Sequence, residues 1–192
     1  MSGRYDFLVE TYRTERLKIL GVWSQIPDDR MRFRPEKRAR SPLEHMVHQC
    51  VSENNWMRDM LGISVSQAPL PAQESRSAFI SHYELSSSER LQALAGRRDE
   101  WFEETTRFFD VDRSRAWVLT RRIAHSAHHR GQLTVYLRLW GQAVYSTYGP
   151  TADTGGLAVN GARVIYPSTT LRASGNEPLP LTSEKPVSER PD

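Results

Sequence analysis

The sequence predicts an all-α protein, a four-helix bundle followed by an extended, partly disordered tail. Four segments place apolar residues three and four positions apart, and no segment alternates convincingly as a strand would. The composition changes after residue 149, because the last 43 residues contain six of the eleven prolines and many Gly, Ser and Thr. We therefore expect a bundle domain over residues 1–149 and a Pro/Gly/Ser-rich tail over residues 150–192.

The first two helices are expected over about residues 5–25 and 41–61. The first has an amphipathic pattern and ends before Pro27. The second begins at Ser41, which can cap the helix, and Glu44 three residues later completes a capping box.

The third helix is expected to begin near residues 86–89, where three serines and a glutamate form another capping signal. A long polar connection over about residues 64–77 would precede it. Its apolar stripe consists of Leu91, Leu94, Trp101, Phe102 and Phe108. The fourth helix is expected to begin between Asp112 and Ser114 and to end at Gly141.

Charge and composition favour a protein without nucleic acid or membrane partners. The net charge is +3, and arginines alternate with acidic residues along most of the chain. The one concentrated basic run, residues 30–40, lies at an expected helix–helix connection, so we interpret it as a solvated loop and keep nucleic-acid binding as a less favoured alternative. The chain contains no run of about 18 apolar residues, so the sequence predicts no membrane span.

Cysteine usage indicates a reducing environment. Cys50 is the only cysteine, which rules out an internal disulfide framework. The N-terminal residues carry charges every few positions and lack the apolar segment of a signal peptide. We therefore expect a cytoplasmic location.

Residues 125–133, HSAHHRGQL, contain three of the six histidines. On an ideal helix His125 and His129 lie about 40° apart on the apolar face, while His128 lies on the flank. Histidines at positions i and i+4 can share one metal ion. The alternative is that both are core residues that hydrogen-bond to a neighbour.

A catalytic zinc usually takes three protein ligands and keeps one position open, so a third ligand is needed. His45, His48 and His82 are the candidates, and periodicity alone does not choose among them. A purely structural site would be closed by a fourth ligand, for which His45 or His82 are available.

The residues around these histidines resemble the DinB/YfiT-like family. HSAHHRGQL followed by YLRLWG is similar to the last-helix signature of that family. PLEHMVH at residues 42–48, followed by Glu53 and Trp56, is similar to its second-helix signature. Residues 148–153, YGPTAD, resemble a tail found in some members. The resemblance covers roughly residues 5–153.

This resemblance implies a four-helix bundle that holds a divalent metal ion, zinc or nickel, through His48, His125 and His129. It also implies a homodimer. In such an open three-histidine site the ion lowers the pKa of a bound thiol or water. By family analogy we favour an enzyme of the S-transferase type, which would join a low-molecular-weight thiol to a small-molecule electrophile.

Three alternatives remain at this stage: a metal-dependent hydrolase, a non-enzymatic metal-binding or partner-binding protein, and a nucleic-acid-binding protein. The sequence assigns no catalytic residue. Cys50 is expected in the core rather than at the site, and Glu53 is expected to form an ion pair with an arginine such as Arg130.

Several side chains are candidates to orient ligands or substrate. Gln132 and Tyr136 follow His129 on the same face, and Asn55 and Asp59 lie on the His48 side of the second helix. Arg121 and Arg122 precede the motif by one turn and could reach a carboxylate of the thiol, although a solvated face is the default expectation for both.

Overall fold

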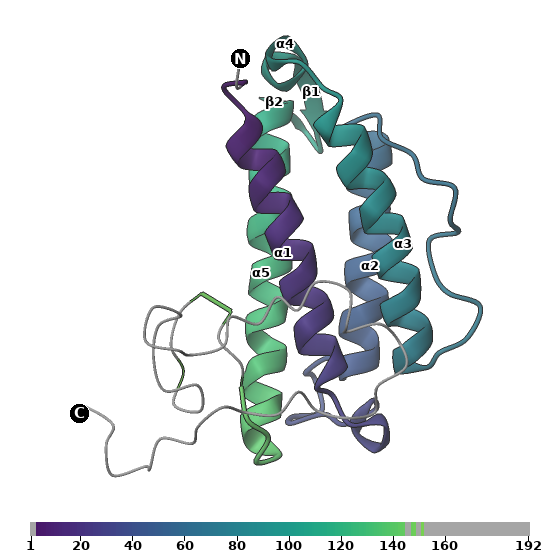
Figure 1. Cartoon of the computed structure of the whole chain (residues 1–192). Coiled ribbons are helices and arrows are strands. Elements are labelled where there is room, and N and C mark those ends of the chain that lie inside the picture. The colour runs from purple at the N-terminus through teal and green to yellow at the C-terminus, as the bar shows by residue number, and fades with distance from the viewer. Residues whose placement is uncertain (1–2, 145–146, 149–150, 152–192) are drawn as a thin grey trace.

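The computed structural model describes residues 3–144, 147, 148 and 151, and four long helices run side by side in it as a bundle (Figure 1). The elements in chain order are α1 (Asp6–Ser24), a 3-10 turn η1 (Asp28–Arg30), α2 (Pro42–Asp59), α3 (Arg76–Ala95), a short α4 (Asp99–Glu103), β1 (Thr105–Phe108), β2 (Val111–Ser114) and α5 (Arg115–Leu139). The four-helix bundle is therefore confirmed. The predicted tail, with its boundary at 149/150, lies almost wholly outside the described residues.

The starts of α2 and α5 follow their capping signals. The Ser41 hydroxyl accepts a hydrogen bond from the Glu44 amide, and the Glu44 carboxylate accepts one from the Ser41 amide. Ser114 caps α5 by accepting from the Trp117 amide. Gly62 and Gly141 follow α2 and α5 with φ of 65° and 68°, a left-handed conformation that glycine adopts without strain.

The predicted start of the third helix is wrong. Helix α3 begins ten residues earlier, where Ser75 caps it by accepting from the Ala78 amide, and the three serines at 86–88 lie inside the helix. The Ser87 and Ser88 hydroxyls accept hydrogen bonds from the Arg16 guanidinium on α1, at 2.8 and 2.6 Å. These serines therefore join α3 to α1 instead of starting a helix.

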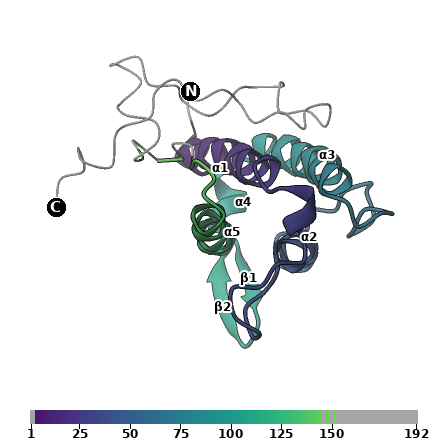
Figure 2. The ribbon, with the colours of Figure 1, turned by 90° about the horizontal axis from the view of Figure 1, so that it is seen from below.

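Residues 105–114 form an antiparallel hairpin that the sequence analysis missed. Thr105 pairs with Ser114 and Phe108 with Val111, so Phe109 and Asp110 form a two-residue turn. The apolar stripe that suggested a continuous helix is thus divided among α3, α4 and β1. The hairpin projects on the side of the bundle bounded by α2 and α5 (Figure 2).

Two apolar clusters fill the interior of the bundle. One contains Trp23, Met46, Phe79 and Leu137, among others, and the second is built around residues such as Leu8, Met57, Leu94, Phe102 and Val118. Burying these side chains is the main stabilising contribution to the fold. Among the described residues, no helix is long and apolar enough to cross a membrane.

A buried carboxylate links the two clusters. Glu53 is 1% exposed and accepts hydrogen bonds from the Tyr12 hydroxyl at 2.6 Å and the Tyr83 hydroxyl at 3.0 Å. Its ion-pair partners are Arg90 on α3 and Arg122 on α5, at 3.5 and 3.8 Å. One side chain of α2 is thereby tied to the other three long helices.

The expected ion pair of Glu53 with an arginine is therefore confirmed, but Arg130, the partner offered as an example, is wrong. Arg130 instead forms an ion pair with Glu15 on α1, at 2.7 Å. The two carboxylates occupy different levels of the bundle, and a helical wheel of one segment carries no information on which partner helix lies opposite.

Candidate metal centre

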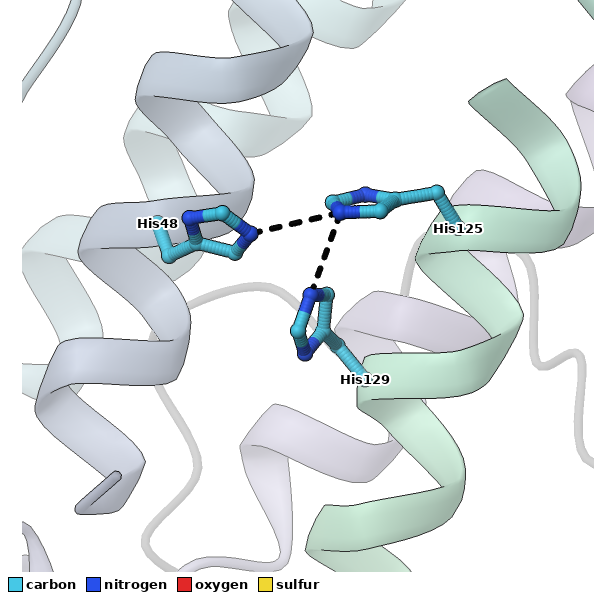
Figure 3. A group of neighbouring side chains, drawn as sticks. All are labelled: His48, His125 and His129. Carbon is cyan, nitrogen blue, oxygen red and sulfur yellow. Dashed lines mark hydrogen bonds between the residues drawn. The ribbon is translucent and has the colours of Figure 1, made fainter. Parts of the chain in front are cut away.

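Helices α2 and α5 bring His48, His125 and His129 together (Figure 3). One nitrogen of each imidazole lies within 4.8 Å of the others. Nε2 of His125 lies 3.3 Å from Nε2 of His48 and 3.2 Å from Nε2 of His129. His48 comes from α2 and the i, i+4 pair from α5, so the loop-free middle of two long helices holds all three side chains.

The spacing of these nitrogens fits a tetrahedral ion. For zinc–nitrogen bonds of about 2.0–2.1 Å, two ligands at the tetrahedral angle are separated by about 3.3–3.4 Å. The two Nε2 separations of 3.3 and 3.2 Å are close to that value. The arrangement is therefore compatible with binding a divalent metal ion.

The protonation of the rings also fits metal binding. Nδ1–H of His129 donates to the side-chain oxygen of Gln132 at 2.9 Å, which leaves a lone pair on its Nε2. Nε2 of His125 faces two other Nε2 atoms, and a single proton there would satisfy only one of them. A cation between the rings would satisfy all three lone pairs. Gln132 thus orients His129, in the manner that metal-ligating histidines commonly require.

The imidazoles are poised to be neutral near pH 7. Burial and, after it, the positive charge of Arg122 lower the pKa of His125 from 6.5 to about 3. Burial likewise lowers the pKa of His129 to about 4, and the pKa of His48 is lowered for the same reason. Neutral imidazole is the form that binds metal, so none of the three must lose a proton first.

Arg122 is the residue whose role the sequence analysis missed. It was expected on a solvated face, but its side chain is fully buried. It donates to the hydroxyls of Ser52 at 2.8 Å and Ser126 at 2.9 Å, and it lies over the ring of Trp56. Trp56 in turn stacks on the ring of His125 with centroids 5.6 Å apart. The position of Arg122, one turn before His125 on the buried face of the helix, was the signal in the sequence that could have indicated this role.

Neither of the other two candidate histidines belongs to the triad. His45 lies inward of it, with its ring 5.3 Å from that of His129, but its nitrogens are not part of the metal-binding group. His82 donates a hydrogen bond to the backbone oxygen of Pro69, in the connection before α3. Within the described residues the group thus contains three candidate ligands and no fourth.

The remaining candidates divide between the site and other places. The Tyr136 hydroxyl donates to the backbone oxygen of Arg40 at 2.8 Å, and its ring lies beside His45, so it supports the wall of the site. Asn55 and Asp59 both contact Arg58, the latter as an ion pair at 2.6 Å. Arg121 is exposed, as expected for a solvated face.

Cys50 and the basic run are not part of the site. Cys50 is buried in an apolar cluster, and burial raises the pKa of its thiol to about 12, as expected for a core residue. In the segment over residues 30–40, Arg32 pairs with Glu74 and Arg34 with Glu44 at the surface. These pairs are consistent with the interpretation of this segment as a solvated connection.

Comparison with known proteins gives the family. The chain is similar to a DinB-like protein of Bacillus cereus ATCC 10987, with a TM-score of 0.68 and 18% identity over 77% of this chain and 100% of that one. It is also similar to a DinB-like protein of Bacillus subtilis, with a TM-score of 0.57 and 14% identity over 71% of this chain and 94% of that one. At these identities the likeness shows the fold alone. No functionally curated protein matches the chain. The model of the DinB family matches residues 1–155, and the chain therefore belongs to the DinB family.

Proposed function

We propose that His48, His125 and His129 hold a divalent ion, zinc or nickel, and that the site activates a low-molecular-weight thiol for transfer to a small electrophile. The observation that carries this proposal is the convergence of three neutral imidazoles with Nε2 separations of 3.2 and 3.3 Å. A divalent ion held there would supply positive charge that lowers the pKa of a bound thiol or water.

The number of ligands supports a reactive site over a structural one. Structural zinc sites are closed by four protein ligands, whereas catalytic sites use three and keep a position for water or substrate. The triad has three, and His45, the nearest further histidine, does not join it. His48 and His125 are also only partly buried, which leaves the site in reach of a small molecule.

The surroundings favour a thiol over water as the nucleophile. Hydrolysis by an activated water generally needs a neighbouring carboxylate or histidine as general base, as the glutamate of an HExxH site provides. No carboxylate belongs to the group formed by the triad in the described residues. Glu53, a buried carboxylate on the same helix as His48, is held by two tyrosines and two arginines. A thiol loses its proton at the ion without such a base.

The thiol must come from a cosubstrate. Cys50, the only cysteine of the chain, is buried among apolar side chains and has a pKa of about 12. In the proposed reaction the sulfur of the added thiol forms a bond to the electrophilic carbon. The leaving group departs with its electron pair, and the thiol proton is released to solvent.

The test compares three proteins purified without chelator: wild type, His125→Ala and His128→Ala. His128 is exposed and lies in the same motif but outside the triad, so it is a matched control. We expect about one equivalent of zinc or nickel in the wild type and in His128→Ala, and little in His125→Ala. Thiol consumption with chloroacetamide as the electrophile should follow the metal content.

The outcomes separate the alternatives. A wild-type protein that refuses added zinc and nickel would overturn the proposal. Metal binding with hydrolysis of an activated ester and no thiol consumption would indicate a hydrolase. Metal binding with neither reaction would leave a non-enzymatic metal-binding protein.

A further inference from the structure

An aromatic surface extends from the triad to the tip of the hairpin. It consists of Trp56 on α2, Phe108 and Phe109 on the hairpin and Trp117 on α5, which we call the aromatic wall. The ring of Trp56 lies 5.2 Å from that of Phe108 and 6.0 Å from that of Phe109. Phe108 also contacts Trp117, with centroids 5.0 Å apart. The four rings therefore form one continuous apolar surface.

This wall begins at a metal-ligating position. Trp56 stacks on the ring of His125, with centroids 5.6 Å apart and an angle of 30° between the planes. The hairpin lies on the side of the bundle bounded by α2 and α5 (Figure 2), and these are the two helices whose histidine rings point toward one another (Figure 3). An apolar group on a small molecule that binds the ion would thus lie directly beside aromatic rings.

The outer rings of the wall are exposed to solvent, which is unfavourable for large apolar side chains. Phe109 is 66% exposed and Trp117 is 40% exposed. Phe109 is also the only non-glycine residue with positive φ in the described part of the chain, at 52°. Glycine or asparagine normally occupies such a position in a hairpin turn, because a bulky side chain is strained there. Strained residues of this kind commonly mark functional positions.

We propose that the aromatic wall binds the apolar group of the electrophilic substrate, next to the open position of the triad. This inference rests on the proposed function and adds the substrate class: a small electrophile that carries an aryl or similar apolar group. Aromatic side chains bind such groups through edge-to-face and stacked contacts, without any need for a charged partner. Phe109 is then a specificity-determining residue rather than a catalytic one.

The test uses binding, so it does not depend on turnover. Acetohydroxamate and benzohydroxamate carry the same metal-binding group and differ in a methyl against a phenyl group. Their affinities for the zinc-loaded full chain would be measured by titration calorimetry. In the wild type we expect benzohydroxamate to bind about tenfold more tightly than acetohydroxamate, since the phenyl ring gains aromatic contacts.

Phe109→Gly is the informative variant because glycine relieves the backbone at positive φ, so the hairpin should fold at least as well. We expect it to keep the affinity for acetohydroxamate and to lose most of the preference for benzohydroxamate. Phe7→Ala is the matched control: Phe7 is a 60% exposed phenylalanine on α1, a helix that contributes no residue to the wall. It should keep the full preference.

The possible failures are distinguishable. If acetohydroxamate does not bind the zinc-loaded protein, the site has no open position, and the proposed function fails together with this inference. If acetohydroxamate binds but Phe109→Gly keeps the wild-type preference, the inference alone is overturned. A change from dimer to monomer in Phe109→Gly, measured by analytical ultracentrifugation, would also overturn it, because the wall would then be an interface between copies.

Discussion

Glu53 and Arg122 form a fully buried ion pair, 3.8 Å between a carboxylate oxygen and Nε, and it joins the two helices that carry the histidine triad. Arg122 also contacts Ser52 and Ser126 and lies over Trp56, which stacks on His125. The pair therefore connects α2 to α5 next to the site. Stability and metal geometry should depend on the same residues.

Arg122→Leu should destabilise the protein by about 3–5 kcal/mol, because it removes a partner from a buried charge and leaves Glu53 with weaker compensation. The free energy of unfolding in urea measures this. Arg121→Leu is the control: Arg121 is the exposed neighbour, and its replacement should change stability by no more than about 0.5 kcal/mol. A loss at Arg122 as small as that at Arg121 would show that the pair does not hold the helices.

Gln132→Leu should weaken metal binding by about tenfold or more with little effect on folding. Gln132 accepts a hydrogen bond from Nδ1 of His129 and is itself exposed. Removing such an orienting partner typically lowers metal affinity by about 10–100-fold. Competition with a chromophoric chelator measures the affinity. Gln132→Glu keeps an acceptor oxygen and should retain most of the metal affinity. An equal loss of affinity in the two variants would contradict the orienting role of Gln132.

The metal-free protein should lose stability as the pH falls below about 6.5. The pKa values of His125 and His129 are lowered to about 3 and about 4 in the folded state, whereas the unfolded histidines titrate near 6.5. Between these values the unfolded state binds more protons, so acidification favours unfolding. Stability is full above pH 6.5 and declines toward pH 4.

Urea titrations of metal-free protein at pH 7.5 and 5 test this prediction. His125→Gln removes one of the titrating groups and should reduce the difference between the two pH values. Equal stability of the metal-free wild type at both values would contradict the burial of the triad as neutral rings.

Cys50 should be inert in the folded protein. Its thiol is buried and has a pKa raised to about 12, so almost no thiolate exists near pH 7. An aromatic disulfide reagent should release no chromophore from the native protein and one equivalent in denaturant. Rapid reaction of the native protein would show that Cys50 is reachable and would revive it as a nucleophile.

The parts of the fold that the sequence predicted correctly have local causes. The starts of α2 and α5 follow from Ser41 with Glu44 and from Ser114, whose caps bond within one turn. The pair of His125 and His129 follows from helical periodicity. Helical periodicity did not decide between His48 and His45, because both lie on the inner half of α2. Only the position of α5 determines which of the two joins the triad.

The errors arose where distant contacts override local signals. The serines at 86–88 were interpreted as a cap, but Arg16 of α1 binds two of them from 71 and 72 residues away. Phe108 was placed on a helical stripe, whereas it pairs with Val111 and packs against Trp56 and Trp117 from two other helices. The partner of Glu53 was likewise decided by which helices surround α2, and that information is not present in any single segment.

The most direct test of the account is X-ray absorption spectroscopy of the zinc-loaded protein, with and without an added thiol such as 2-mercaptoethanol. We predict three imidazole nitrogens and one further light ligand at about 2.0–2.1 Å, and a sulfur ligand at about 2.3 Å once the thiol is present. His128→Ala should give the same spectra. A site with four protein ligands that does not change on adding thiol would contradict the account, as would a failure of the triad to bind the ion.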